Sequence, residues 1–302
     1  MINKVLPAQN NVLRFLRHLL PIISDSPTTL KAGKVMRKVN EDLDFYLPFR
    51  RHAPSLANAR RTIYADTNRL ANEDGVGFFN VLAFRGVFFG SPFARSSRFR
   101  WFESFNDWTT FQETEKAIAE EVGPSATEYY VKPNCYGRRQ KERSVDLLPK
   151  YWNQRARWND LFNKLTTPSV REVYRWLASS RADDHTIQFR NIGSLTAFLI
   201  CGDLVEAGVL PMPSSDEIGR IISSMDMGAT AGMKQFNLVP EKADGEEICQ
   251  AFILLDETLQ RELGTEEKKD MGYNVIMLEH ALCKMSRLIS RGLKLEVLLS
   301  EI

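Results

Sequence analysis

The chain has 302 residues, with 40 Lys and Arg against 38 Asp and Glu, and 43% of its residues are hydrophobic. These values are typical of a globular protein and exclude a disordered or fibrous chain. The apolar stretch near the start is interrupted by Arg14, Arg17, His18 and Pro21, so we expect an amphipathic helix there and neither a signal peptide nor a membrane span.

The cysteines and the charge distribution give further evidence on the class of protein. The four cysteines contain no CxxC pair, which disfavours a zinc site or a disulfide framework and suits a reducing cytoplasm. We therefore expect packing cysteines, no metal and no cofactor. Residues 1–182 carry a net charge of +11 and residues 183–302 carry −9. This contrast predicts a basic lobe (1–182) that meets a polyanion and an acidic lobe (183–302) with a different partner; the alternative is two ordinary solvated surfaces.

Helical periodicity dominates in chain order and predicts a mainly all-α fold. Helices are expected over residues 10–23, 29–47, 56–72, 78–88, 110–122, 151–165 and 169–180, and again in the later apolar runs. Residues 126–137 and 185–193 are the candidates for extended or hairpin structure. Ser169 and either Ser214 or Ser215 are the expected helix caps.

Two early segments combine arginine with aromatic residues. They are residues 49–69 and 78–102, and the second contains Asn80 and Arg85. Arginine fits phosphate in a fork geometry and aromatic rings stack on unpaired bases, which suits bound DNA with an exposed base. The alternative is that these aromatic side chains belong to the core.

The sequence "NIGSLTAFLICGDL", residues 191–204, predicts a helix entered from a tight turn. Gly193, Ser194 and Thr196 suit a helix-hairpin-helix turn, where backbone N–H groups and the positive end of a helix approach a DNA phosphate. Asn191 stands where such a hairpin usually has its first glycine. The alternative is a glycine that merely starts a helix. Asp203 interrupts this apolar run, and a second acid, Asp216, follows beyond it.

Two later segments add candidates. Gly228 and Gly232 flank small residues before Lys234, a turn suited to backbone amides that face an anionic group, although such turns more often just connect helices. Glu279 and His280 lie in an apolar helix, where they suit proton transfer or, equally, a structural pair.

Five motifs in order resemble the helical, DNA-glycosylase-related proteins of thymine hypermodification in bacteriophages. These are the alpha-glutamyl/putrescinyl thymine pyrophosphorylases and the helical domain of hydroxymethyluracil DNA kinases. The motifs are "FFNVLAFR" (78–85), "NIGSLTAFLICGDL" (191–204), "SSDEIGRII" (214–222), "MGATAGM" (227–233) and "LEHALCKMSR" (278–287), so the resemblance spans roughly residues 40–292. The chain departs from the family pattern at Lys284, Ser286 and Arg287, and at Gly228, Ala229 and Thr230.

The resemblance implies a DNA-glycosylase-like fold and a transferase in the cytoplasm of an infected host cell. Its partners would be DNA containing modified thymine and a small amine donor, an amino acid such as glycine or a polyamine. The amine would displace pyrophosphate from 5-(pyrophosphoryloxymethyl)uracil after the base leaves the stack. The implied roles are catalysis for Asp216, Asp203, Glu279 and His280, DNA contact for Asn80, Arg85, Gly193, Ser194 and Thr196, and leaving-group contact for Gly228, Gly232 and Lys234. Two alternatives remain: a base-excising glycosylase and a non-catalytic DNA-binding accessory protein.

Overall fold

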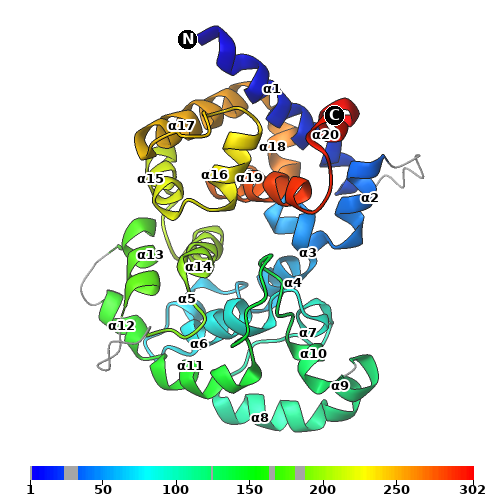
Figure 1. The fold of residues 1–302 in the computed structure, drawn as a ribbon. Helices are drawn as coiled ribbons and strands as arrows, with labels where there is room; N and C mark the ends of the chain where they lie inside the picture. The colour runs from blue at the N-terminus through cyan, green and yellow to red at the C-terminus, as the bar shows by residue number, and fades with distance from the viewer. Residues whose placement is uncertain (1, 24–32, 124, 163–166, 181–187) are drawn as a thin grey trace. The chain divides into compact units, whose positions relative to one another are not determined.

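The computed structural model describes residues 2–23, 33–123, 125–162, 167–180 and 188–302 (Figure 1). Within these ranges the chain forms twenty α-helices, several short 3-10 turns and one π-helical segment, and no strand. The predicted all-α class is confirmed. The start of the segment expected to be extended near residue 185 lies outside the described residues.

The chain divides into two compact units. The discontinuous unit contains Met1–Ala53 and Pro213–Ile302, and the continuous unit is Pro54–Met212. The lobe boundary predicted after residue 182 falls within the continuous unit, at a position outside the described residues.

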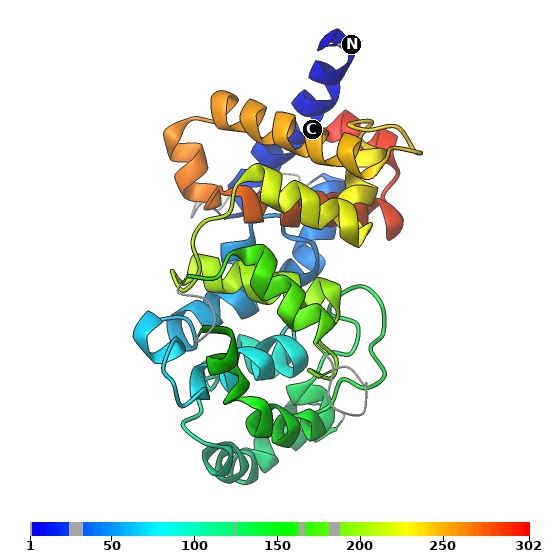
Figure 2. The ribbon, with the colours of Figure 1, turned by 90° about the vertical axis from the view of Figure 1, so that its left-hand side faces the viewer.

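The discontinuous unit is organised around helix α19, Val275–Ser290, because most of its residues are buried. Helices α15 (Ser215–Met225), α16 (Gly228–Gln235) and α3 (Leu43–Tyr46) pack against it. Helix α17 (Gly245–Glu262) lies along α15, as Figure 2 shows. The other elements of this unit are α1 (Ile2–Leu19), η1 (Leu20–Ile22), α2 (Lys34–Glu41), η2 (Arg50–His52), α18 (Thr265–Met271) and α20 (Leu295–Glu301).

Helices from the first and last parts of the chain contact one another in the discontinuous unit. Helix α2 begins after Gly33 and has no side-chain cap of its own. The carboxylate of Glu301, in α20, instead accepts the N–H groups of Lys34 and Val35 at 2.9 Å each. This contact satisfies amides that the helix cannot bond internally, so the last helix of the chain stabilises one of the first.

The continuous unit is built around α6 (Val76–Ala83) and the π-helical segment η3 (Phe84–Phe88), whose residues are all buried. Helices α11 (Leu148–Gln154) and α14 (Ser194–Glu206) pack against this pair. The remaining elements are α4 (Pro54–Thr62), α5 (Thr67–Leu70), α7 (Pro92–Arg95), α8 (Phe105–Thr114), α9 (Lys116–Val122), α10 (Ala126–Tyr130), η4 (Val145–Leu147), α12 (Arg157–Phe162) and α13 (Val170–Ser179). A π-helical insertion in a core helix is rare and is frequently found at functional sites.

Local sequence signals explain several helix ends. Ser169 caps α13 in a capping box with Glu172, and Ser214 caps α15 by accepting the N–H of Glu217 at 3.1 Å. Both cap predictions are confirmed. The expectation of extended structure over residues 126–137 is wrong in its first part, because α10 occupies Ala126–Tyr130 behind a Ser125 cap.

The cysteines act as packing residues in the described structure. Cys135, Cys201 and Cys249 are buried and Cys283 is partly buried, and none forms a disulfide. Among the described residues, no cluster of three or more His, Cys, Asp or Glu side chains is arranged to hold a metal ion. None of the described helices combines the length and apolar character required to cross a membrane.

Candidate nucleic-acid interface

The turn that enters α14 is exposed at Arg190 and Gly193 and has an unusual backbone. Asn191 has a φ of +64°, the left-handed conformation that glycine adopts without strain and asparagine tolerates. Its side-chain amide donates to the carbonyl of Gly86 at 3.0 Å, which fixes the turn on the π-helical segment. Asn191 thus supplies the conformation that the expected hairpin glycine would supply.

Gly193 is the N-cap residue of α14 and is exposed, while no side chain caps the helix. The first amides of the helix therefore have no side-chain acceptor. A β-carbon built on Gly193 would meet no atom within 4 Å, so the space beside this backbone is open. Ser194 is partly buried and Thr196 is 3% exposed, so the predicted DNA contact of the Thr196 side chain is left without support. An exposed, uncapped helix start favours an anion.

Neighbouring elements hold the approach to this turn. Tyr151 donates its hydroxyl to the carbonyl of Arg190 at 2.6 Å, and Gln154 donates to the carbonyl of Gln188 at 2.7 Å. Phe189 is buried against Trp176, with 5.0 Å between ring centroids. These contacts attach the turn to α11 and α13. The connection from α13 includes residues 181–187, which lie outside the described ranges, so a helix-hairpin-helix motif stays a prediction.

Asp203 lies in the apolar run of α14 because it has a buried cationic partner. Arg85, in η3, donates through Nε to Oδ2 at 2.5 Å and through a terminal nitrogen to Oδ1 at 2.6 Å. The Tyr64 hydroxyl donates to the same carboxylate at 2.8 Å. Burial alone would lower the pKa of Arg85, but the charge and hydrogen bonds of Asp203, together with Tyr136 and Tyr64, outweigh burial and raise this pKa well above its ordinary value. The pair is a charged, bidentate link between η3 and α14.

This arrangement leaves the predicted phosphate contacts of Asn80 and Arg85 without support. Both residues are 1% exposed. Asn80 donates to the carbonyls of Val76 and Phe102 and accepts the N–H of Phe102, so its whole amide is used inside the unit. The motif "FFNVLAFR" therefore has a structural explanation: it supplies the polar connections of a buried helix.

Asp216 differs sharply from Asp203. It lies in the first turn of α15, its side chain is 51% exposed, and it pairs with Arg220 one turn along at 2.9 Å. A carboxylate at a helix start is stabilised by the helix dipole. Of the two predicted catalytic carboxylates, Asp216 is the one that solvent and a ligand can reach.

Glu279 and His280 are both buried in α19. The Cys283 thiol donates to the Glu279 carboxyl at 3.0 Å, and burial raises the pKa of Glu279 although nearby Arg50 and Lys284 oppose this. Burial and Glu279 together raise the pKa of the Cys283 thiol well above its ordinary value. The thiol is therefore protonated and unreactive near neutral pH.

The residues that follow in α19 tie this helix to α3. Lys284 donates to the carbonyls of Asp44 and Phe45 at 2.8 and 2.9 Å, and Arg287 donates to Phe45 at 3.0 Å. Cations at the carbonyl end of a helix satisfy groups that the helix leaves unbonded. Burial lowers the pKa of Lys284 well below its ordinary value, with Arg287 adding to the effect.

The segment predicted as a leaving-group turn is a helix. Gly228 begins α16 and Gly232 lies within it. A β-carbon on Gly228 would lie 2.8 Å from the Cys283 sulfur, and one on Gly232 would overlap the Leu282 carbonyl oxygen. Both glycines let α16 approach α19 closely, which corrects the interpretation of an anion-binding turn. Lys234, in the last turn of α16, lies 3.9 Å from Asp226, the residue that ends α15.

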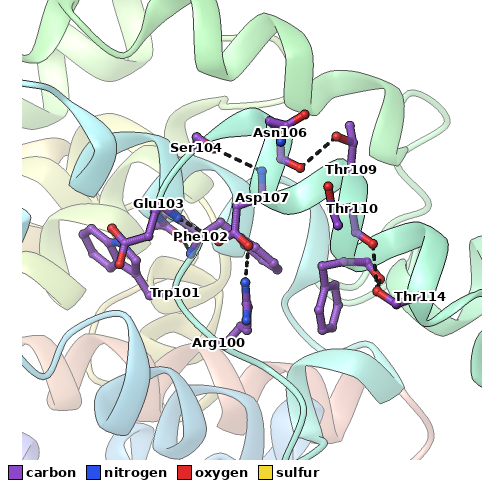
Figure 3. A network of polar contacts seen from close by, with 12 residues as sticks. Arg100, Trp101, Phe102, Glu103, Ser104, Asn106, Asp107, Thr109, Thr110 and Thr114 are labelled. Atoms are coloured by element: carbon purple, nitrogen blue, oxygen red, sulfur yellow. Dashed lines mark hydrogen bonds and ion pairs between the residues drawn. The ribbon is translucent and has the colours of Figure 1, made fainter.

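The second arginine-rich aromatic segment also has mostly internal partners. Arg98 pairs with Glu115 and Arg100 pairs with Asp107, while Phe99 and Phe102 are buried. Figure 3 shows Arg100 and Asp107 pointing toward one another beside the capped start of α8, where the Asp107 N–H donates to Ser104 Oγ at 3.0 Å. The alternative interpretation, core aromatics, describes this segment better than stacking on bases.

The predicted site residues divide between the two units. Asn80, Arg85, Gly193, Ser194, Thr196 and Asp203 belong to the continuous unit, and Asp216, Gly228, Gly232, Lys234, Glu279 and His280 belong to the discontinuous one. The charge contrast of the sequence halves does not follow this division. The continuous unit has 21 Lys and Arg against 18 Asp and Glu, and the discontinuous unit has 19 against 20.

One basic segment was not among the nucleic-acid-binding candidates predicted from the sequence. Residues 137–143, "GRRQKER", form a loop between α10 and η4 with three exposed cationic side chains, Arg138, Arg139 and Lys141. A short run rich in Lys and Arg is a recognised signal for a nucleic-acid patch and would have identified it.

Comparisons with known proteins identify no relative of this chain. No family model matches the chain, and neither the curated proteins nor the solved structures contain a match to it.

Proposed function

We propose that this protein binds DNA through the turn that enters α14 and acts on a pyrimidine base that has left the stack. The observation that carries the proposal is the exposed start of α14, where Gly193 leaves open space beside amides without a side-chain cap. Such a helix start attracts a phosphate through its N–H groups and its dipole. Asn191, held to the π-helical segment, keeps the turn in place.

We further propose that the reaction is the displacement of pyrophosphate from 5-(pyrophosphoryloxymethyl)uracil by an amine. The amine nitrogen bonds to the methylene carbon, the carbon–oxygen bond breaks, pyrophosphate departs and a base takes the proton from nitrogen. This assignment rests on the motif resemblance together with the availability of one carboxylate. Asp216 is half exposed and suits the proton acceptor, whereas Asp203 is already neutralised by Arg85.

A glycine variant tests the DNA contact. Gly193→Ala adds a methyl group that touches no other part of the protein, so we expect the free energy of unfolding to change little. The methyl group would stand where a phosphate approaches, so affinity for a short DNA duplex should fall several-fold in a fluorescence anisotropy titration.

Gly245→Ala is the matched control, because Gly245 also begins a helix with room for a methyl group but follows the Asp244 side-chain cap. It should bind DNA as the wild type does. Equal affinity of the wild type and Gly193→Ala would remove the α14 turn from the DNA contact.

Nucleoside analysis tests the reaction. The protein is mixed with pyrophosphorylated hydroxymethyluracil DNA and a pool of amino acids and polyamines, and the digested nucleosides are weighed by mass spectrometry. The proposal expects an amine-bearing thymidine from the wild type and loss of that product from Asp216→Asn. Asp226→Asn removes another exposed carboxylate, at a left-handed position that asparagine accepts, and should keep activity.

The two alternatives give different products. Abasic sites would identify a base-excising glycosylase, and DNA of unchanged base mass would identify a non-catalytic binding protein.

A further inference from the structure

The loop between α10 and η4, residues 131–144, presents a cluster of positive charge. Arg138, Arg139 and Lys141 are exposed, and none of them has a carboxylate partner among the described residues. Glu142 is the acidic residue of this stretch, and it is engaged by Arg190 at 3.1 Å. The loop therefore keeps three cations directed to solvent.

A partly buried tyrosine and a buried arginine fix the base of this loop to the core of the continuous unit. Tyr136 stacks on Phe89, with ring centroids 5.4 Å apart and planes within 8°, and its hydroxyl donates to the Arg85 carbonyl at 2.9 Å. Arg143 donates to the carbonyls of Val87 and Phe89 at 3.0 and 3.1 Å. The Arg143 guanidinium also lies 5.1 Å from the Tyr136 ring centre.

Backbone contacts fix the tip between these anchors. The N–H of Gln140 donates to the Pro133 carbonyl at 2.9 Å, and the N–H of Gly137 donates to Asn134 at 2.9 Å. Gly137 has a φ of +96°, which a residue with a side chain rarely adopts. The cationic side chains thus extend from a backbone that is already ordered, so binding a partner costs little loop entropy.

We infer that this loop binds the phosphate backbone of duplex DNA. Guanidinium groups fit phosphate in a fork geometry, and a lysine adds a point charge. The most exposed large apolar side chains of the described residues, Val122, Met212, Met227 and Leu254, all lie outside the loop, so it offers no apolar anchor for a lipid surface.

The position of the loop extends the proposed function, on which this part of the inference rests. The ion pair between Glu142 and Arg190 joins the loop to the segment directly before the α14 turn. Tyr136 and Asn191 are both bonded to carbonyls of η3. A DNA strand held at Gly193 would therefore have a second set of phosphate contacts from the same scaffold.

Salt-dependent binding tests the inference. Affinity of the full chain for an unmodified 20-base-pair duplex is measured by fluorescence anisotropy at several salt concentrations, for the wild type and for Arg138→Ala/Arg139→Ala/Lys141→Ala. Each lost phosphate contact lowers the slope of log affinity against log salt by about 0.9, so the triple variant should have a slope shallower by about 2 to 3. Its affinity at low salt should fall at least about tenfold.

The control removes three exposed lysines that lie outside the loop, Lys116, Lys242 and Lys294, and so changes the net charge equally. It should keep most of the slope. The inference is overturned if the loop variant and this control have the same slope, or if the wild type shows no salt-dependent binding. Transfer activity is measured separately with modified DNA, so a protein that binds through the loop but modifies no base would contradict the proposed reaction alone.

Discussion

The two units stabilise their buried ionisable side chains in different ways. Each is built around a buried helical segment that carries ionisable side chains, η3 with α14 in the continuous unit and α19 in the discontinuous unit. In the first, Arg85 and Asp203 neutralise one another through two hydrogen bonds. In the second, Lys284 donates hydrogen bonds to backbone carbonyls, and the Glu279 carboxyl accepts a hydrogen bond from the Cys283 thiol.

The comparison shows which unit should respond to mutation and which to pH. A buried charge that has lost its partner is costly, because the remaining ion is neither solvated nor paired. A buried acid without a directly bonded cation shifts its pKa instead, so its stability contribution changes with pH. We therefore expect the continuous unit to be most sensitive to loss of one partner and the discontinuous unit to carry the pH dependence.

The largest effect should come from Arg85→Met. This change leaves the buried Asp203 carboxylate without its cation and should lower the free energy of unfolding by about 3 to 5 kcal/mol in urea titrations. The double variant Arg85→Met/Asp203→Leu removes both charges and should regain a large part of that loss. Arg220→Met, which breaks the exposed pair with Asp216, is the control and should change stability little. A double variant as unstable as the single one would show that burial of charge is not the cause.

A smaller effect is expected from Gly232→Ala in the discontinuous unit. The added β-carbon would overlap the backbone oxygen of Leu282, so α16 and α19 must separate. Such overpacking typically costs about 1 to 3 kcal/mol. Gly245→Ala, where the added methyl group makes only ordinary contacts, should be close to the wild type in the same urea titration. If both variants are equally stable, close approach of the two helices does not require this glycine.

The smallest effect should be a change in pH dependence for Glu279→Gln. The folded pKa of Glu279 is raised by burial above its ordinary value of 4.5, so the folded state binds this proton more tightly than the unfolded chain does. Its contribution is complete below pH about 4.5 and is lost as pH rises through the folded pKa. Glutamine does not titrate, so the variant should lose less stability than the wild type between pH 4.5 and 7. Lys284 is present in both proteins, so its own titration largely cancels in the difference. Parallel stability profiles over this range would contradict the shift.

Local signals in the sequence predicted much of the fold. The helical periodicity indicated an all-α chain, and Ser169 and Ser214 marked two helix starts, because a cap depends on residues within one turn of the helix. Residues 126–137 were assigned less well, since aromatic and β-branched side chains there favour strands while a serine cap and tertiary packing produce α10.

The candidate site was less predictable, because its contacts join residues that are far apart in the sequence. Arg85 and Asp203 are 118 positions apart, and no local pattern indicates that each is the partner of the other. Gly228 and Gly232 have the spacing of an anion-binding turn, but the reason for each glycine is a neighbouring helix more than forty positions later.

The sequence by itself determined the helical class, the serine caps of α13 and α15 and the glycine-entered start of α14, because periodicity, capping and turn conformation act over a few residues. Only the tertiary structure decided which charges are buried as pairs, which remain at the surface, and how the charged residues are distributed. The net charges of +11 and −9 for the two sequence halves become +3 and −1 for the two compact units, because the chain returns to its first unit after residue 212. Burial and pairing depend on which distant segments meet, and packing of the whole chain fixes those meetings.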